Sequence, residues 1–116
     1  MKHNTSTLTG ALLDAAVSKA EGQEPEIVPY RVSGGMGITF VRDEPVCQVG
    51  AQHFEPSSRW EHGGPIIERE LLSLHPTNEG WCAFVGLHDH EHTGPTPLVA
   101  AMRAYVAAKL GDEVEL

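Results

Sequence analysis

Apolar residues recur every three or four positions near both ends of the chain, which is the pattern of helices with one buried face. The stripe near the N-terminus consists of Leu13, Ala16, Val17 and Ala20. Thr9 precedes this stripe as an N-cap residue, and Gly22 follows it as a residue that accepts the left-handed conformation of a helix end. The pattern predicts a helix over residues 10–21.

A second helix is predicted between Thr96 and Gly111. Thr96 is a suitable N-cap, and Pro97 occupies the first helical position, where its missing N–H costs nothing. Lys109 lies in the last turn, where a cation suits the helix dipole, and Gly111 ends the helix. The residues that share one face are Leu98, Met102, Tyr105, Val106 and Lys109.

Between these helices, short runs of β-branched and aromatic residues alternate with turn residues and predict strands. Residues 26–32 and 37–41 flank a glycine-rich turn and are predicted to form a hairpin. Pro29 places the first of these strands at a sheet edge, because proline has no N–H to donate to a neighbouring strand. Residues 45–64 are predicted to be irregular.

A second pair of strands is predicted at residues 65–74 and 80–87, joined by a hairpin loop at residues 75–80. Alternation along the last strand assigns its residues to two faces. One face holds Trp81, Ala83, Val85 and Leu87, and the other holds Cys82 and Phe84. Together the elements predict a single α+β domain over residues 1–116, in which a small antiparallel sheet of three to four strands is flanked by an N-terminal and a C-terminal helix.

The charge of the chain is strongly one-sided. Lys and Arg number 8 against 16 Asp and Glu, so the formal net charge is −8. Such a surface repels phosphate backbones, and it suits solubility or a basic protein partner. No run approaches the ~20 apolar residues of a membrane helix, and the first ten residues lack the apolar core of a signal peptide. We therefore expect a cytoplasmic protein with no membrane segment and no nucleic-acid partner.

Two segments resemble the NinX-like family of small uncharacterised phage and prophage proteins. They are Phe54-Glu-Pro-Ser-Ser-Arg-Trp-Glu-His-Gly-Gly-Pro-Ile-Ile-Glu-Arg-Glu70 and the C-terminal stretch from Gly94 to Val114, and residues 8–22 are similar too. The resemblance covers nearly the whole chain, except that residues 32–50 and the histidine-rich stretch depart from the usual pattern. It implies one NinX-like domain and a phage-related, cytosolic protein with no established activity, and it supplies no catalytic residues.

The stretch Leu87-His-Asp-His-Glu-His-Thr93 raises the question of a metal site. If it continued the preceding strand, His88, His90 and His92 would share one face about 6–7 Å apart. Imidazoles at such spacing bind zinc, nickel or copper. No second ligand cluster is evident, because the other candidates are scattered among turns. We therefore interpret the stretch as a polar loop that holds no ion in the native protein, and no cofactor is expected.

Catalytic motifs are not evident either: the chain contains no G-x-S-x-G, no H-E-x-x-H and no P-loop. Cys47 and Cys82 are interpreted as free thiols, and Cys82 lies in an apolar strand, where a thiol is buried and inert. Glu68 and Glu70 lie two positions apart in a predicted strand, so they would share one face, as an acidic pair or simply as part of a solvated surface. Arg69 would then point inward or lie at a sheet edge. We therefore expect a protein that is not an enzyme.

The segment Trp60-Glu-His-Gly-Gly-Pro65 is the best candidate for a binding surface. Tryptophan often anchors interfaces, and paired glycines let another backbone approach closely. The simpler interpretation is a turn whose tryptophan caps the core. The candidate binding residues are Trp60, Gly63, Gly64, Pro65, Glu68, Glu70, Gly94, Pro95 and Arg103.

Three hypotheses about function follow. The first is a non-catalytic accessory or protein-interaction module of phage origin, with an unknown protein partner. The alternative is a nucleic-acid-binding domain, because a helix, an antiparallel sheet and a C-terminal helix resemble the order of double-stranded-RNA-binding domains. Against it, such domains carry basic residues where the second helix begins, whereas here Arg103 and Lys109 come later. The third and weakest hypothesis is a small hydrolase or metal binding through His88, His90 and His92.

Overall fold

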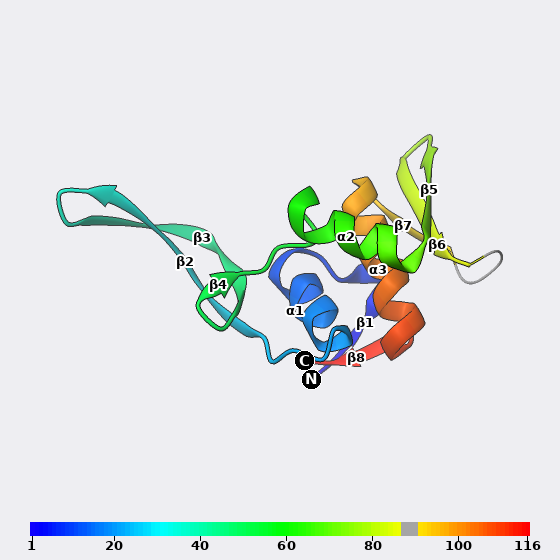
Figure 1. Cartoon of the computed structure of the whole chain (residues 1–116), viewed down its shortest axis with the longest axis horizontal. Coiled ribbons are helices and arrows are strands. Elements are labelled where there is room, and N and C mark those ends of the chain that lie inside the picture. The colour runs from blue at the N-terminus through cyan, green and yellow to red at the C-terminus, as the bar shows by residue number, and fades with distance from the viewer. Residues whose placement is uncertain (87–90) are drawn as a thin grey trace.

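In the residues that it describes, the structure, a computed structural model, contains three helices and eight strands (Figure 1). It describes residues 1–86 and 91–116, excluding the side chains of residues 31–34 and 38–43. The helices are α1 (Gly10–Ala20), α2 (Trp60–Glu70) and α3 (Pro97–Leu110), and a 3-10 turn, η1 (Thr5–Thr7), precedes α1. The strands are β1 (Lys2–Asn4), β2 (Glu26–Gly35), β3 (Ile38–Val49), β4 (Gln52–His53), β5 (Leu72–Thr77), β6 (Gly80–Val85), β7 (His92–Gly94) and β8 (Glu113–Glu115).

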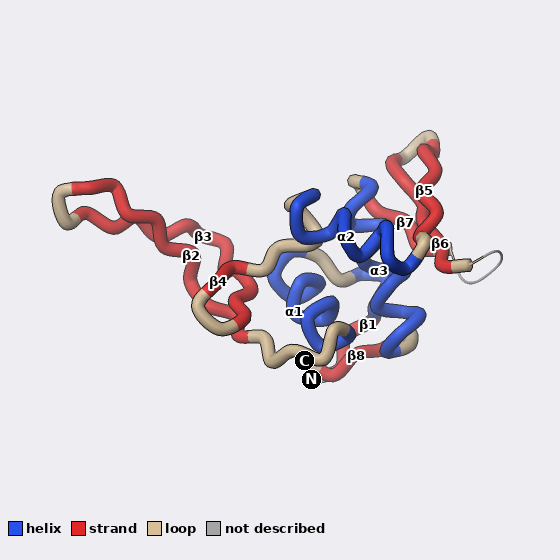
Figure 2. The backbone as a smooth tube through the Cα atoms, in the orientation of Figure 1, coloured by secondary structure: helices blue, strands red, loops and turns tan. Residues whose placement is uncertain are grey.

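Helix α3 lies at the centre of the molecule. It contacts α1, α2 and the sheet of β5, β6 and β7, so every residue from Leu98 to Val106 is buried (Figure 2). The sequence predicted one buried face, and the structure buries the whole middle of the helix because neighbours cover it on several sides. Its alanines permit this close approach, since they bring little volume to the contact.

The α+β class with antiparallel pairing and flanking N- and C-terminal helices is confirmed. The strands divide into three small sheets, with the orders β1–β8, β2–β3–β4 and β5–β6–β7. The first of these joins the two ends of the chain, and Lys2 pairs with Glu115. Helix α2 separates the other two sheets along the chain. The elements therefore do not follow the simple order of helix, sheet and helix on which the comparison with double-stranded-RNA-binding domains rests.

The hairpin of β2 and β3 projects from the rest of the molecule as a long arm, and the molecule extends over 53 × 29 × 23 Å (Figure 1). The predicted hairpin is confirmed, and so is the position of β2 at a sheet edge. Pro29 pairs in register with Pro45 on β3. The irregular structure predicted for residues 45–64 is wrong for residues 45–49, which continue β3, for residues 52–53, which form β4, and for residues 60–64, which begin α2.

The strand predicted for residues 65–74 is wrong for residues 65–71, because residues 60–70 form helix α2, and it is right only for residues 72–74, which begin β5. The paired isoleucines suggested a strand, but Gly63 and Ile66, three positions apart, are the buried residues of α2. Packing of this face against its neighbours therefore outweighs local propensity. The helix ends at Leu71. This residue adopts the left-handed conformation (φ 54°, ψ 46°) that is usually occupied by glycine at a helix end.

The hairpin of β5 and β6 is confirmed for its second strand, and the loop is shorter than predicted because β5 runs on to Thr77. The alternation predicted along β6 is also confirmed. Ala83 is buried in the core, and Trp81 and Val85 pack against the same core from partly exposed positions. Leu87, the fourth residue of this face, lies outside the described residues.

Thr96 and Thr9 offer a matched test of helix capping. The Oγ1 atom of Thr96 accepts a hydrogen bond of 3.1 Å from the backbone N–H of Val99, whereas Thr9 precedes α1 without a side-chain cap bond. We expect Thr96→Ala to lower the free energy of unfolding by about 1 kcal/mol and Thr9→Ala to leave it nearly unchanged. Urea denaturation of both variants measures this difference, and equal effects would contradict the assignment of the two caps.

Candidate functional site

A groove lies where α1, α2 and α3 begin. It consists of two adjoining hollows of about 390 and 400 Å³, both of which are lined by Gly10, Ser57 and Ser58. The first hollow, which we call the acidic hollow, extends toward the base of the β2–β3 arm. The second, which we call the apolar hollow, extends toward the start of α3 at Pro97 and Leu98. The groove thus joins two chemically different ends.

Trp60 lines the apolar hollow as the first residue of α2, and it is 55% exposed. The interpretation that this tryptophan caps the core in a turn is therefore wrong. A helix begins at Trp60, with Arg59 as its N-cap, and this geometry directs the indole outward beside Thr96 and Pro97. An exposed tryptophan next to an apolar hollow has the chemistry of an interface anchor.

The paired glycines differ in their surroundings. A Cβ atom at Gly63 would lie 2.4 Å from the carbonyl oxygen of Pro56 and 2.7 Å from Cδ2 of Leu98, whereas one at Gly64 would meet nothing within 4 Å. Gly63 therefore lets α2 pack closely against the segment before it and against α3. This close packing forms a wall of the groove. Gly64 and the exposed Pro65 take no part in this contact.

Asp14 lies at the floor of the acidic hollow and is only 3% exposed. Its Oδ1 atom accepts a hydrogen bond of 2.8 Å from the backbone N–H of Ser57. Burial raises the pKa of Asp14 to about 6, although the hydrogen bonds from Ser57 act in the opposite direction and the nearby Glu55 adds to the rise. The groove therefore contains a carboxyl group that gains its charge near neutral pH.

Glu55 and Arg59 form the other side of the acidic hollow. Oε2 of Glu55 lies 3.0 Å from Nε of Arg59, but this buried oxygen receives no aligned hydrogen bond. The guanidinium of Arg59 is about half exposed and also lies 2.9 Å from Oε1 of Glu61. The backbone N–H of Glu55 donates to Nδ1 of His62 at 2.9 Å, which ties the segment to α2. Glu44 adds an exposed carboxylate at the rim.

Asp14 makes stability depend on pH in a defined direction. An acid whose pKa is raised on folding stabilises the folded state only while it is protonated, so this contribution is lost as the pH rises from about 4 to about 6. The variant Asp14→Asn keeps an oxygen acceptor but does not gain a charge. Its free energy of unfolding, taken relative to that of the wild type, should therefore be about 2 kcal/mol higher at pH 8 than at pH 4. Urea denaturation of both proteins at the two pH values measures the difference, and parallel pH profiles would contradict it.

Both cysteines are free, as the sequence predicts, and both are buried. Burial, together with the negative charges of Asp14 and Glu55, raises the pKa of Cys47 to about 12. Since the thiolate is the reactive form, Cys47 is a poor nucleophile even though it lies beside the groove.

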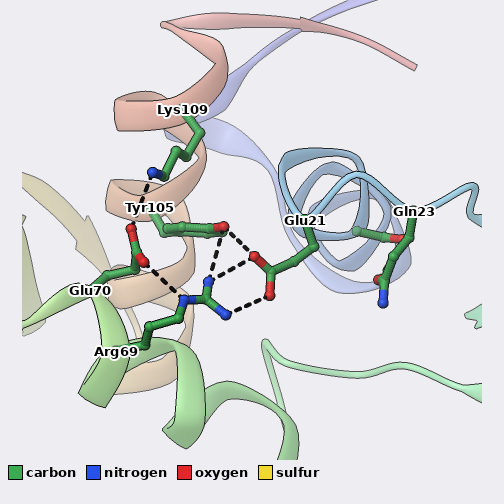
Figure 3. A network of polar contacts seen from close by, with 7 residues as sticks. Glu21, Gln23, Arg69, Glu70, Tyr105 and Lys109 are labelled. Carbon is green, nitrogen blue, oxygen red and sulfur yellow. Dashed lines mark hydrogen bonds and ion pairs between the residues drawn. The ribbon is translucent and has the colours of Figure 1, made fainter.

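The acidic pair predicted from Glu68 and Glu70 is wrong, because residues two apart on a helix point in nearly opposite directions. Glu68 is exposed, whereas Glu70 lies 2.9 Å from Nε of Arg69 and 3.3 Å from Nζ of Lys109. The inward position predicted for Arg69 is also wrong, because this residue lies on helix α2 with its side chain half exposed. It pairs with both carboxylate oxygens of Glu21, at 3.0 and 2.7 Å (Figure 3).

This network joins the C-terminal ends of α1 and α2 to α3. Tyr105 on α3 donates a short hydrogen bond to Glu21 and accepts one of 3.3 Å from Arg69 (Figure 3). Burial alone would raise the pKa of Glu21, but the hydrogen bonds from Arg69 and Tyr105 outweigh it, and the pKa falls below its usual value. The arrangement satisfies its own charges and is a structural clamp. In the sequence, the only indication of this network was Arg69, which did not fit either face of the predicted strand.

The remaining candidates lie elsewhere. Gly94, Pro95 and Arg103 line a separate pocket beside β6 and β7. His92 is the first residue of β7 and is 8% exposed, so its assignment to a polar loop is wrong: it pairs in register with Ala83. His88 and His90 lie outside the described residues. Among the residues that the structure describes, no group of three His, Cys, Asp or Glu side chains is placed to hold a metal ion.

The fold and the groove define a small α+β protein in which three helix starts surround an acidic and an apolar hollow. No helix in the described part of the chain is long and apolar enough to span a membrane. The family described as "Bacteriophage P22, NinX" matches residues 4–109, and the chain belongs to this phage family. The resemblance seen in the sequence is thereby confirmed. Among curated proteins no match to the chain is found.

Proposed function

We propose that this phage-related protein is a non-catalytic interaction module that binds a basic, extended segment of a partner protein in the groove. The observation that supports this most strongly is the continuity of the two hollows. Exposed Trp60 lies at the apolar end, and the carboxyl groups of Asp14 and Glu55 lie at the acidic end. One short segment with an apolar residue next to a lysine or arginine would satisfy both ends.

The charges of the groove favour a cationic occupant. The buried Oε2 atom of Glu55 accepts no hydrogen bond. It forms an ion pair with Arg59, whose side chain is about half exposed. A partner guanidinium can therefore take the place of Arg59 at little cost, because exposed pairs contribute little. The net charge of −8 draws basic segments toward the protein from a distance and raises the rate of encounter.

The non-catalytic assignment rests on one group that lines the groove, Asp14, and one that lies beside it, Cys47. Oδ1 of Asp14 is already engaged by the backbone of Ser57, and the thiol of Cys47 stays protonated at neutral pH. Neither group forms the hydrogen-bonded pair of nucleophile and base that covalent catalysis requires. We also place the protein in the host cytoplasm, where free thiols such as Cys47 and Cys82 remain reduced.

Binding of a short Lys/Arg-rich peptide with one central leucine tests the proposal. We expect Asp14→Asn and Glu55→Gln each to raise its Kd by about tenfold, because each removes a partly desolvated partner of the cation. Glu68→Gln is the matched control, since it removes one negative charge from an exposed position of α2 outside the groove. Calorimetric titration measures all three variants at physiological salt.

Two outcomes would count against the proposal. Equal weakening by Glu68→Gln would indicate general charge attraction without a site. Retention of duplex RNA or DNA, with a steep loss of affinity as salt is added, would favour the nucleic-acid alternative instead.

A further inference from the structure

A second pocket, of about 340 Å³, lies on the other side of the start of α3 from the groove and does not share a lining residue with it. Its walls come from the turn and strand of the β5–β6 hairpin, from β7 and from α3. The residues with polar or aromatic chemistry that line it are Thr77, Glu79, Trp81, Thr93 and Arg103.

Arg103 is the unusual member of this pocket, because it is a charged side chain that is only 8% exposed. Its Nε donates to the carbonyl oxygen of Leu8 at 2.9 Å, and its Nη1 donates to that of Thr93 at 2.6 Å. Neither acceptor carries a charge, and no carboxylate of the described residues forms an ion pair with Arg103. Buried charges in proteins are normally paired, whereas this cation has no ion-pair partner among the side chains that the structure describes in residues 1–86 and 91–116.

The guanidinium also keeps unused donors. It has five N–H groups in a planar fork. The two bonds to carbonyl oxygens leave three of them without an acceptor in the described part of the chain. The bonds to Leu8 and Thr93 hold the fork in a fixed orientation at the pocket wall. A fixed, partly desolvated guanidinium is the group that binds carboxylate or phosphate most strongly.

Two glycines allow the pocket to exist beside this cation. A Cβ atom at Gly94 would lie 2.7 Å from the backbone nitrogen of Ala100, and one at Gly80 would lie 2.6 Å from the carbonyl oxygen of Gly94. The backbones of the hairpin, β7 and α3 therefore approach one another closely at this point. This close approach brings Trp81 and Arg103 to the same pocket.

The other charges around the pocket select among anions. Glu79 lines the same pocket from the exposed turn of the hairpin, and the whole chain is strongly acidic. Both disfavour a phosphate dianion more than a single carboxylate. The half-buried indole of Trp81 offers an apolar face for a flat group attached to that carboxylate.

We propose that this pocket binds a monocarboxylate that carries an aromatic group, with Arg103 holding the carboxylate and Trp81 contacting the ring. The ligand is either a small aromatic acid or the free C-terminus of a chain that ends in an aromatic residue. These two sources share the same chemistry. The proposal is independent of the groove.

The test compares N-acetylphenylalanine with its uncharged amide. The protein carries Trp60→Phe, so that fluorescence reports on Trp81. We expect the acid to change the Trp81 signal with saturation and to raise the melting temperature, and the amide to do neither at the same concentration. A peptide ending in phenylalanine, free or amidated, distinguishes the two sources: tighter binding of the free peptide than of the small acid assigns a chain terminus, and the reverse assigns a small acid.

Two variants separate binding from folding. Arg103→Lys keeps the charge and loses the planar fork, so it should lower affinity for the acid at least tenfold. Glu79→Gln alters an exposed turn residue and should strengthen binding about threefold, because it removes a like charge from the pocket. If Arg103 had only a structural role, Glu79→Gln would not change the affinity for the acid. Equal binding of acid and amide, or equal binding of inorganic phosphate, would overturn the proposal.

Discussion

Replacing Leu13 with alanine should lower the free energy of unfolding by about 3 kcal/mol, the largest effect that we expect of a single substitution. Leu13 is 0% exposed and belongs to the core that α1 and α3 share. Its truncation removes buried methyl groups and leaves a cavity, because the neighbouring α3 is covered on several sides and cannot collapse into the space.

The adjacent residue supplies the control. Leu12 is 36% exposed, so Leu12→Ala changes the same atoms on the same helix with much less loss of burial. We expect a change below about 1 kcal/mol for this variant. Urea denaturation at neutral pH measures both. Effects of equal size would contradict the orientation of α1 and, with it, the floor of the groove.

Gly63→Ala should be the next most damaging change, with a loss of about 2 kcal/mol. The added methyl group would collide with the carbonyl oxygen of Pro56 and with Leu98. The first of these is backbone and cannot move aside without shifting the segment that leads into α2. Gly64→Ala should act in the opposite direction and raise stability by up to about 1 kcal/mol, because alanine favours a helix where space is open.

The opposite signs expected of these neighbouring glycines test the helical assignment of residues 60–70. A loop or a strand over these residues offers no reason for alanine to stabilise one position and destabilise the next. Thermal unfolding of both variants provides the comparison. A loss of stability at both positions would contradict the contacts of α2.

The two terminal helices could be predicted from the sequence because their signals are local. Periodic apolar residues, the Thr96-Pro97 start and the glycines near each end all act within a few residues of where they stand. The β2–β3 hairpin was predictable for the same reason. Its length was not, because the proline at position 45 suggested a break, whereas the ladder accommodates it opposite Pro29.

Helix α2 could not be predicted from local signals. Its interior proline and paired isoleucines indicate a strand or a turn, and its end at Leu71 lacks the usual glycine. The helix depends on contacts with Pro56 and α3, which only the folded chain provides. The candidate site was affected in the same way. Trp60 was identified, but Asp14 and Glu55 were not, since only the fold brings them to the groove.

Arg103 illustrates a different limit. The sequence identified it as a basic residue of the second helix and grouped it with Trp60, whereas the structure places it with Gly94 and Pro95 in another pocket. Its burial could not be predicted, because the middle of α3 is enclosed on all sides and a single arginine in an alanine-rich helix normally reaches solvent.

Site-specific photo-cross-linking in host cells that express the phage genes tests the central claim, that the groove receives a basic segment, most directly. A photoreactive residue replaces Ser58 at the groove or, as the control, Leu71 at the far end of α2, which is 79% exposed. We expect the Ser58 probe to become attached to a segment with lysine or arginine next to an apolar residue, and this attachment to disappear with Asp14→Asn and Glu55→Gln combined. The same products at Leu71, or attached segments without basic residues, would contradict the claim.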